Sequence, residues 1–210
     1  MSLVHTQFAD HDYLRIGLIS DTHIPEARRE LWPQVFEAFA GVDLILHGGD
    51  IHELVVLDQL HDIAPLWAAR GNGEDGSGGR PIQPDHPRLR EAWLLKLGGL
   101  VVGLTHDVPI PEYPPHLTLD RALQRYFGRT DLDVLIYGDT HVEAIDTFPH
   151  ETGETLCVNP GSPTYPHNLD TRLGTIGFLE ISSGKAEATI WQLNEDGIVP
   201  FDWSTQRKWR

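Results

Sequence analysis

The sequence has a single cysteine, few basic residues and no long apolar run. Cys157 cannot form a disulfide within the chain, so we expect a reducing, cytoplasmic setting. No apolar run approaches the roughly 20 residues that cross a bilayer. The N-terminus also lacks the basic-then-apolar layout of a signal peptide. We therefore expect neither secretion nor a membrane anchor.

Basic residues are too few for a nucleic-acid or anionic-membrane face. The chain has 16 Lys and Arg against 31 Asp and Glu, a net charge of -15, and Lys/Arg runs stay at two residues before the terminal RKWR. A small anionic substrate stays open, because bound metal ions can dominate the local field. At 210 residues and 40% hydrophobic content, the chain is expected to form one domain, 1–210. Residues 1–12 are a candidate flexible segment, and homo-oligomerisation is left open.

Strands and helices alternate in the first part of the chain, which is typical of βαβ units and a parallel sheet. The expected elements there are strands Tyr13–Ser20, Val42–Asp50 and Ala64–Asn72, separated by helices Arg29–Gly41 and His52–Asp62. Further on, Gly98 and Gly99 indicate the turn of a hairpin. A helix at Leu117–Phe127 and a strand at Asp133–Asp139 then precede a run of strands. This order predicts a mixed α/β fold, with two sheets packed together and helices outside.

Polar side chains follow five of the expected strands, and the tripeptide Asp-Thr-His occurs at two of these strand ends. In chain order the polar residues are Asp21, His23, Asp50, Asn72, His106, Asp139 and His141. Ligand sites in open α/β sheets form beyond the carboxyl ends of strands, so the five loops are expected to converge. Carboxylate, imidazole and amide groups without thiolate suit manganese, iron, zinc or cobalt. Seven such groups exceed the needs of one ion and fit two ions that share a bridging ligand.

Each motif taken alone has an ordinary structural explanation. A strand-end aspartate is commonly a turn former, Asn72 follows a glycine as turn residues do, and His47 in HGGD can be a core histidine. Asp75, just past GNG, either orients a ligand histidine or forms a turn. The order of all five motifs, each after an apolar strand, favours a metal centre over coincidence.

Together the motifs resemble those of the calcineurin-like metallophosphoesterases, and within them the small bacterial and archaeal phosphodiesterase branch, which is similar in fold to a retromer subunit. The matching segments are Asp21-Thr22-His23, Gly49-Asp50, Gly71-Asn72, Thr105-His106, Gly138-Asp139-Thr140-His141 and VNPGSPTYP at Val158–Pro166. The resemblance extends over Ile16–Pro166. It implies a four-layer αββα sandwich of two mixed β-sheets flanked by helices, with a dinuclear metal site.

The resemblance also implies a role for each matching residue. One ion would take Asp21, His23, Asp50 and His141, and the other would take Asp50, Asn72, His106 and Asp139, with Asp50 as the bridge. Asp50, Asn72 and His106 would be the catalytic residues. This chain departs from the pattern at three places. Asp139 stands where the family usually has histidine, Gly73 stands where many relatives have histidine or cysteine, and THDVP replaces a Gly-His pair.

The implied activity is hydrolysis of a small phosphate ester, a phosphodiester rather than a monoester, by attack of a hydroxide that bridges two divalent transition-metal ions. Manganese is the expected metal, with iron, zinc, cobalt or nickel as alternatives. Two other functions are left open. One is an interaction scaffold with a degenerate metal site, and the other is a nuclease of the same fold, which the acidic charge disfavours.

Overall fold

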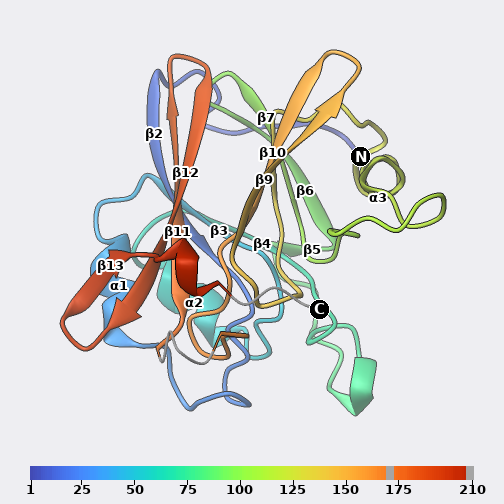
Figure 1. Ribbon diagram of the computed structural model, residues 1–210. Coiled ribbons are helices and arrows are strands. Elements are labelled where there is room, and N and C mark those ends of the chain that lie inside the picture. Colours follow the sequence, from blue (N-terminus) through green and yellow to red (C-terminus); the bar gives the residue numbers. More distant parts are fainter. Residues whose placement is uncertain (169–172, 207–210) are drawn as a thin grey trace.

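The computed structural model describes residues 1–168 and 173–206, and these residues form two β-sheets with helices on their outer faces (Figure 1). The helices are α1 (Pro33–Phe39), α2 (Val55–His61) and α3 (Leu119–Phe127), with short 3-10 turns η1 (Ser77–Gly79) and η3 (Trp203–Thr205). Within the described part of the chain, none of the helices has the length and apolar character required to span a membrane.

One sheet has seven strands in the order β13-β12-β11-β2-β3-β4-β5. Its strands are β2 (Tyr13–Ile19), β3 (Leu44–His47), β4 (Leu66–Ala69), β5 (Leu89–Arg90), β11 (Thr175–Ser182), β12 (Lys185–Asn194) and β13 (Gly197–Pro200). Strands β2 to β5 pair in parallel and β11 to β13 add antiparallel pairs, so the sheet is mixed. The alternating β and α segments at the start of the chain thus build a parallel half, as predicted.

The other sheet has six strands in the order β1-β6-β7-β8-β10-β9. Its strands are β1 (Val4–His5), β6 (Ala92–Leu97), β7 (Leu100–Thr105), β8 (Val134–Ile136), β9 (Ala144–His150) and β10 (Gly153–Asn159). The predicted hairpin joins β6 to β7 through Gly98 (φ 54°) and Gly99 (φ 81°), a left-handed pair that glycine adopts without steric cost. Within residues 1–12, the candidate flexible segment, β1 pairs with β6 and Phe8 lies in the core.

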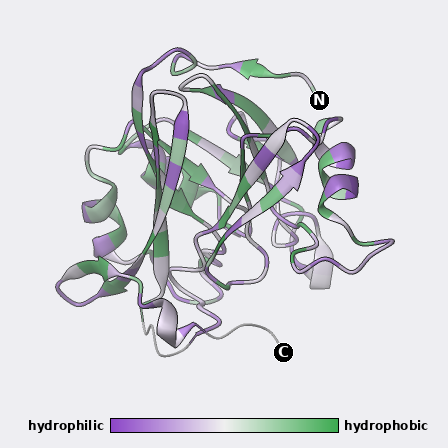
Figure 2. Cartoon of the chain, turned by 45° about the horizontal axis from the view of Figure 1, so that its top comes forward, coloured by the Kyte–Doolittle hydropathy of each residue, from purple (hydrophilic) through white to green (hydrophobic). Residues whose placement is uncertain are grey.

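Three apolar clusters define the layers. The first lies between the two sheets and includes Leu14 and Leu18 of β2 together with Leu95 of β6. The second joins α1 and α2 to the seven-stranded sheet through Phe39 and Leu57, among others. A third packs α3 on the six-stranded sheet. Figure 2 shows that apolar residues are concentrated on the strands of the two sheets. The order helix, sheet, sheet, helix confirms the predicted αββα sandwich.

All three helices begin later than the sequence predicted, and for α3 the start is Leu119 rather than Leu117. The first was expected from Arg29 but begins at Pro33, because proline fits the first turn of a helix, where its missing N–H needs no partner. The second was expected from His52 but begins at Val55. His52 has a left-handed backbone (φ 70°), which a right-handed helix does not accommodate.

Candidate metal centre

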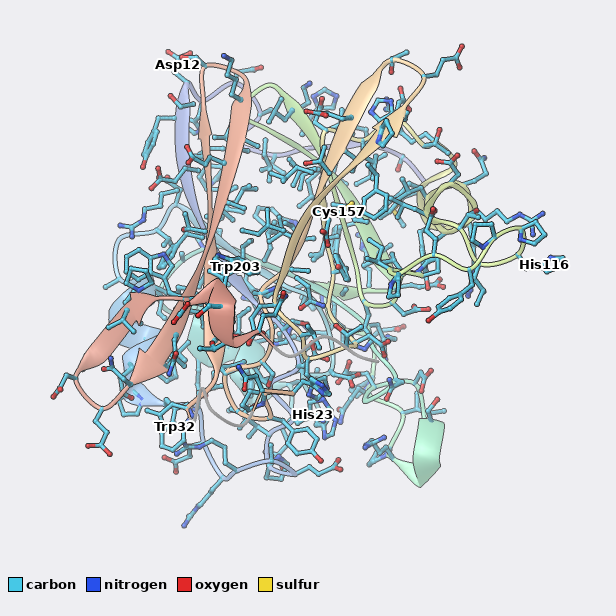
Figure 3. All side chains as sticks on the ribbon, in the orientation of Figure 1. Asp12, His23, Trp32, His116, Cys157 and Trp203 are labelled. Atoms are coloured by element: carbon cyan, nitrogen blue, oxygen red, sulfur yellow. The ribbon has the colours of Figure 1, made fainter. Side chains whose placement is uncertain are left out.

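The seven candidate residues lie in loops that follow β2, β3, β4, β7 and β8. Asp21 and His23 follow β2, Asp50 follows β3, Asn72 follows β4, His106 follows β7, and Asp139 and His141 follow β8. Figure 3 shows His23 below the two sheets, at the end of the molecule where these loops meet. The parallel strands therefore bring residues from five separate loops to one region, as the strand-end pattern predicted.

Three Asp-x-His turns share one unusual backbone form. Left-handed φ angles occur at Asp21 (54°), His23 (43°), Asp50 (53°), His52 (70°), Asp139 (70°) and His141 (57°). Among the described residues other than glycine, only Ser183 shares this sign. Such conformations cost free energy and persist where the surrounding structure holds them, commonly at functional sites. The third turn, Asp50-Ile51-His52, was not recognised in the sequence.

Asp50 lies between two imidazoles and presents a different oxygen to each. Its Oδ2 is 3.3 Å from Nε2 of His23, and its Oδ1 is 3.3 Å from Nε2 of His106. Oδ1 also accepts a hydrogen bond from the Gly73 backbone N–H (2.7 Å). Burial alone would raise the pKa of Asp50, but the two imidazoles and this N–H hold it well below its usual range. A carboxylate that is ionised and shared by two histidines is well placed to bridge two cations.

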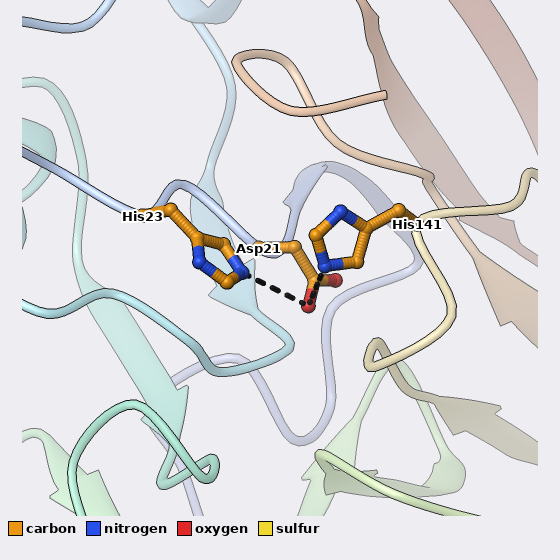
Figure 4. A group of neighbouring side chains, drawn as sticks. All are labelled: Asp21, His23 and His141. Atoms are coloured by element: carbon orange, nitrogen blue, oxygen red, sulfur yellow. Dashed lines mark ion pairs between the residues drawn. The ribbon is translucent and has the colours of Figure 1, made fainter. Parts of the chain in front are cut away.

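Asp21 forms a second group with His23 and His141 (Figure 4). Its Oδ1 is 3.5 Å from Nε2 of His141 and 4.0 Å from Nε2 of His23, and it accepts a hydrogen bond from the Asp139 backbone N–H (3.2 Å). Its Oδ2 is buried without a hydrogen-bond partner. Burial raises the pKa of Asp21, so the protein by itself disfavours the ionised form that a cation would stabilise.

Two of the candidate ligand imidazoles are oriented by backbone carbonyls. Nδ1 of His106 lies 2.7 Å from the carbonyl oxygen of Gly48, and Nδ1 of His141 lies 2.5 Å from that of Tyr165. A carbonyl only accepts, so each Nδ1 carries a proton, and each Nε2 faces the carboxylates, where a bound cation would take the place of a proton. Nε2 of His23 and Nε2 of His106 are both buried without a hydrogen-bond partner. Buried nitrogen and oxygen donors left without partners fit a bound transition-metal ion.

Asn72 and Asp139 lie at the mouth of the centre. Both are exposed, and with His106 they line a cavity of about 510 Å³. Oδ1 of Asp139 is 3.7 Å from Nε2 of His106, although 44% of the Asp139 side chain remains accessible. The structure therefore brings six of the predicted residues into one connected group, and it places Asn72 on the wall of the same cavity.

The Asn-Pro-Gly-Ser segment and the residues just after it form hydrogen bonds to the two Asp-Thr-His loops. Asn159 donates to the carbonyl of Gly138 (2.8 Å) and accepts from the Gly161 N–H, so it shapes the turn beside the metal-centre loops. Ser162 donates to the carbonyl of Asp21 (2.7 Å), and Thr164 donates to that of Thr22 (2.6 Å). These bonds contribute to holding the left-handed turns in place.

Two residues of the site were missed in the sequence. His52, with His23 and Asp50, forms a group whose candidate ligand atoms all lie within 4.8 Å of one another. Glu74 is fully buried, and its carboxylate accepts hydrogen bonds from three backbone N–H groups, those of Ile51, His52 and Gly71. Asp75, the sequence candidate for orienting a ligand, is exposed and accepts from the Ser77 N–H, so it is the turn former. The repeated Asp-x-His spacing was the signal for His52.

His47 lies behind the centre and connects two of its loops. Its Nδ1 accepts from the Gly49 N–H (3.1 Å), so the neutral ring carries its proton on Nε2, which donates to Oγ1 of Thr22 (3.1 Å). Burial and the neighbouring charge of His106 lower the pKa of His47 to about 3. A neutral His47 therefore links the loop after β3 to the loop after β2.

Known proteins resemble this chain in sequence and in fold. Residues 14–184 match the calcineurin-like phosphoesterase superfamily domain. A "probable metallophosphoesterase" from Methanothermobacter thermautotrophicus is 36% identical over 176 residues, which cover 83% of this chain and 90% of the relative. A second one, from Methanocaldococcus jannaschii, is 37% identical over 153 residues, covering 72% of this chain and 69% of the relative. The structure of Vacuolar Protein Sorting 29 from Cryptosporidium parvum matches at a TM-score of 0.64 and 19% identity, covering 90% of this chain and 96% of that one.

The family match extends over all the loops that form the candidate metal centre, and the structural match shows the same fold. With the two relatives, these matches confirm the resemblance drawn from the Asp-x-His, Gly-Asp and Asn-Pro-Gly-Ser segments. This chain belongs to the calcineurin-like phosphoesterase superfamily.

Proposed function

We propose that the protein is a metal-dependent phosphodiesterase with a dinuclear centre. The observation that carries the proposal is the position of Asp50, whose two oxygens each lie 3.3 Å from a different imidazole nitrogen. With Asp21, His141 and Asp139 beside these imidazoles, the candidate ligand atoms form three overlapping groups, and Asp50 belongs to two of them. This arrangement supports two ions rather than one.

The ligand assignment follows the family pattern, in which Asp50 belongs to both sets of ligands. Asp21, His23, Asp50 and His141 would hold one ion, and Asp50, Asn72, His106 and Asp139 would hold the other. When bound, two divalent ions lower the pKa of coordinated water and neutralise the charge that develops on phosphoryl oxygens. Asp50 would set the separation of the two ions, and the Gly73 N–H holds the Asp50 carboxylate in place. His106, held by the Gly48 carbonyl, keeps its Nε2 directed at Asp50. Asn72, exposed on the cavity wall, would contribute its amide oxygen as a neutral ligand.

The charge of the cavity supports a diester as the substrate. Its wall carries the carboxylates of Asp75, Glu91, Asp107 and Asp139 against two guanidinium groups. One of the two, Arg70, already donates to the carbonyls of Glu74 and Gln83. A phosphodiester carries one negative charge and a phosphomonoester up to two, so an acidic wall disfavours the monoester more.

Metal removal and substrate choice test the proposal together. The chelator-treated protein should lose hydrolysis of bis(p-nitrophenyl) phosphate, and Mn²⁺ should restore it better than Mg²⁺, because imidazole ligands suit transition metals. In the same assay, p-nitrophenyl phosphate should turn over more slowly than the diester. Full activity after complete metal removal would refute the proposal, and a faster monoester would refute the substrate class.

An interaction scaffold is the second candidate function. It is supported by the fold likeness to Vacuolar Protein Sorting 29. The buried donors without partners at Asp21, His23 and His106 favour the metalloenzyme, because a scaffold gains nothing from leaving them unsatisfied. Absence of metal-dependent turnover on any phosphate ester, in a protein that still binds metal, would instead favour the scaffold.

A further inference from the structure

His52, the histidine of the third Asp-x-His turn, lies just before α2, and side chains from other segments bind both its backbone N–H and its carbonyl. Only 8% of the residue is exposed. Its backbone N–H donates to Glu74 Oε1 (2.7 Å), and its carbonyl accepts from Gln83 Nε2 (2.6 Å). The backbone is left-handed, with φ at 70°. Side chains from two other segments therefore fix one strained residue at the edge of the metal centre.

The His52 ring has one partnered nitrogen and one free nitrogen. Nδ1 lies 3.3 Å from Glu26 Oε2, and the Glu26 carboxylate is itself held by Arg80 through bonds of 3.1 Å and 3.2 Å. Because a carboxylate accepts, the proton of the neutral ring belongs on Nδ1. That leaves a lone pair on Nε2, which is buried and has no hydrogen-bond partner in the described structure. A carboxylate behind an imidazole is the arrangement that orients metal-bound histidines.

The free nitrogen lies beside the ligand cluster. The rings of His52 and His23 lie 4.5 Å apart between centroids, and His23, Asp50 and His52 offer ligand atoms within 4.8 Å of one another. A Cβ at Gly73 would stand 2.7 Å from His52 Nε2 and 3.2 Å from Asp50 Oδ1. Both groups therefore border the small space that glycine leaves open at position 73.

We propose that Nε2 of His52 is an additional ligand of the metal centre, on the side formed by His23 and Asp50, and that Glu26 is the positioning residue that orients its ring. The assignment rests on the proposed function, because it requires a metal ion at this centre. A bound cation would give the buried Nε2 the partner that the protein itself does not supply. In this chain the His52 ring can take this position because residue 73 is glycine, which has no Cβ to occupy the same space.

Metal affinity is the direct readout. Co²⁺ binding is measured by competition with a chelator and by the visible absorption of bound Co²⁺, in the full-length protein and in His52→Ala, His52→Gln and Glu26→Gln. His52→Ala and His52→Gln should each weaken binding of one ion by at least about tenfold and change the absorption spectrum. Glu26→Gln should weaken it less, because the His52 imidazole remains in place. His61→Ala, an exposed histidine at the end of α2, is the matched control and should leave both readouts unchanged.

A double substitution tests the link between positions 52 and 73. Gly73→Ala should displace the His52 ring, since the added Cβ would overlap His52 Cδ2, and should weaken Co²⁺ binding. In the His52→Ala background the same change should have little further effect, giving a clear non-additivity. Unchanged affinity and spectrum in both folded His52 variants, in a protein that binds Co²⁺, would overturn the assignment alone. A wild-type protein that takes up no Co²⁺ would overturn the proposed function and the assignment with it.

Discussion

The Glu74 carboxylate accepts the backbone N–H of His52 at 2.7 Å and so ties the loop after β4 to the loop after β3. The same oxygen accepts from Ile51 (2.7 Å), and the other oxygen accepts from Gly71 (2.8 Å). Glu74 is fully buried, so these three N–H groups have no access to water as a replacement partner. The loop that carries Asp50, the proposed bridging ligand, is thus held by a side chain from the next loop.

Glu74→Gln should destabilise the protein by about 2–3 kcal/mol, because an amide has one acceptor oxygen and its NH₂ group would face a backbone donor. Asp75→Asn, one residue further and exposed, should change stability by no more than about 0.5 kcal/mol. Chemical denaturation of both variants measures the difference. Equal stability of the two variants would contradict the role given to Glu74.

Asp50→Ala should abolish phosphodiester hydrolysis, because it removes the carboxylate shared by His23 and His106. Asp75→Ala should reduce the rate far less, since the Asp75 carboxylate lies on the cavity wall outside the candidate ligand groups and accepts from the Ser77 N–H. The expected gap between the variants is at least about tenfold. Initial rates on bis(p-nitrophenyl) phosphate at saturating Mn²⁺ give the comparison, and similar rates in both would refute the assignment of Asp50.

Asp139→His should raise monoester turnover relative to diester turnover. The substitution removes one negative charge beside His106, where Oδ1 of Asp139 now lies 3.7 Å from Nε2. A more positive centre attracts a dianionic monoester more strongly. Rates on p-nitrophenyl phosphate and its diester are compared after metal content has been matched. An unchanged ratio in a variant that retains its metal would mean that Asp139 does not tune the centre through its charge.

Acid should lower the free energy of unfolding, partly through protonation of His47. Burial lowers its pKa from 6.5 to about 3, so the native state keeps it neutral while the unfolded chain takes up a proton below about pH 6.5. The stability from the neutral ring is therefore present above pH 6.5 and is lost as the pH falls toward 3. Compared with His47→Gln, the wild type should lose about 1.4 kcal/mol more per pH unit between about pH 6 and 4. Parallel stability curves for the two proteins would show that His47 is not the group responsible.

The sequence predicted those parts of the site that follow strand periodicity. Asp21, Asp50 and His106 each follow an apolar strand, and the rule that ligands gather at carboxyl strand ends brings them together without knowledge of side-chain packing. The same alternation of strands and helices, together with the family resemblance, predicted the αββα sandwich. The Gly98–Gly99 turn was predictable because glycine is the residue that adopts two successive left-handed conformations cheaply.

The sequence did not reveal features that depend on contacts between loops. Helical spacing after His52 concealed its left-handed backbone, which is held by Glu74 and Gln83 from a distant segment. Glu74 and Asp75 are adjacent and both acidic, yet one is fully buried and the other exposed. Composition and periodicity cannot distinguish such neighbours, because burial of a loop residue is decided by the loop that packs on it.

The central claim, a dinuclear centre bridged by Asp50, is tested most directly by titrating the metal-free protein with Mn²⁺ while following phosphodiester hydrolysis. The rate should rise with added metal and reach its plateau at two ions per chain, because Asp50 directs its two oxygens to two different imidazoles and can therefore be shared by two ions. Full activity without metal, or a plateau at one ion per chain, would contradict the account.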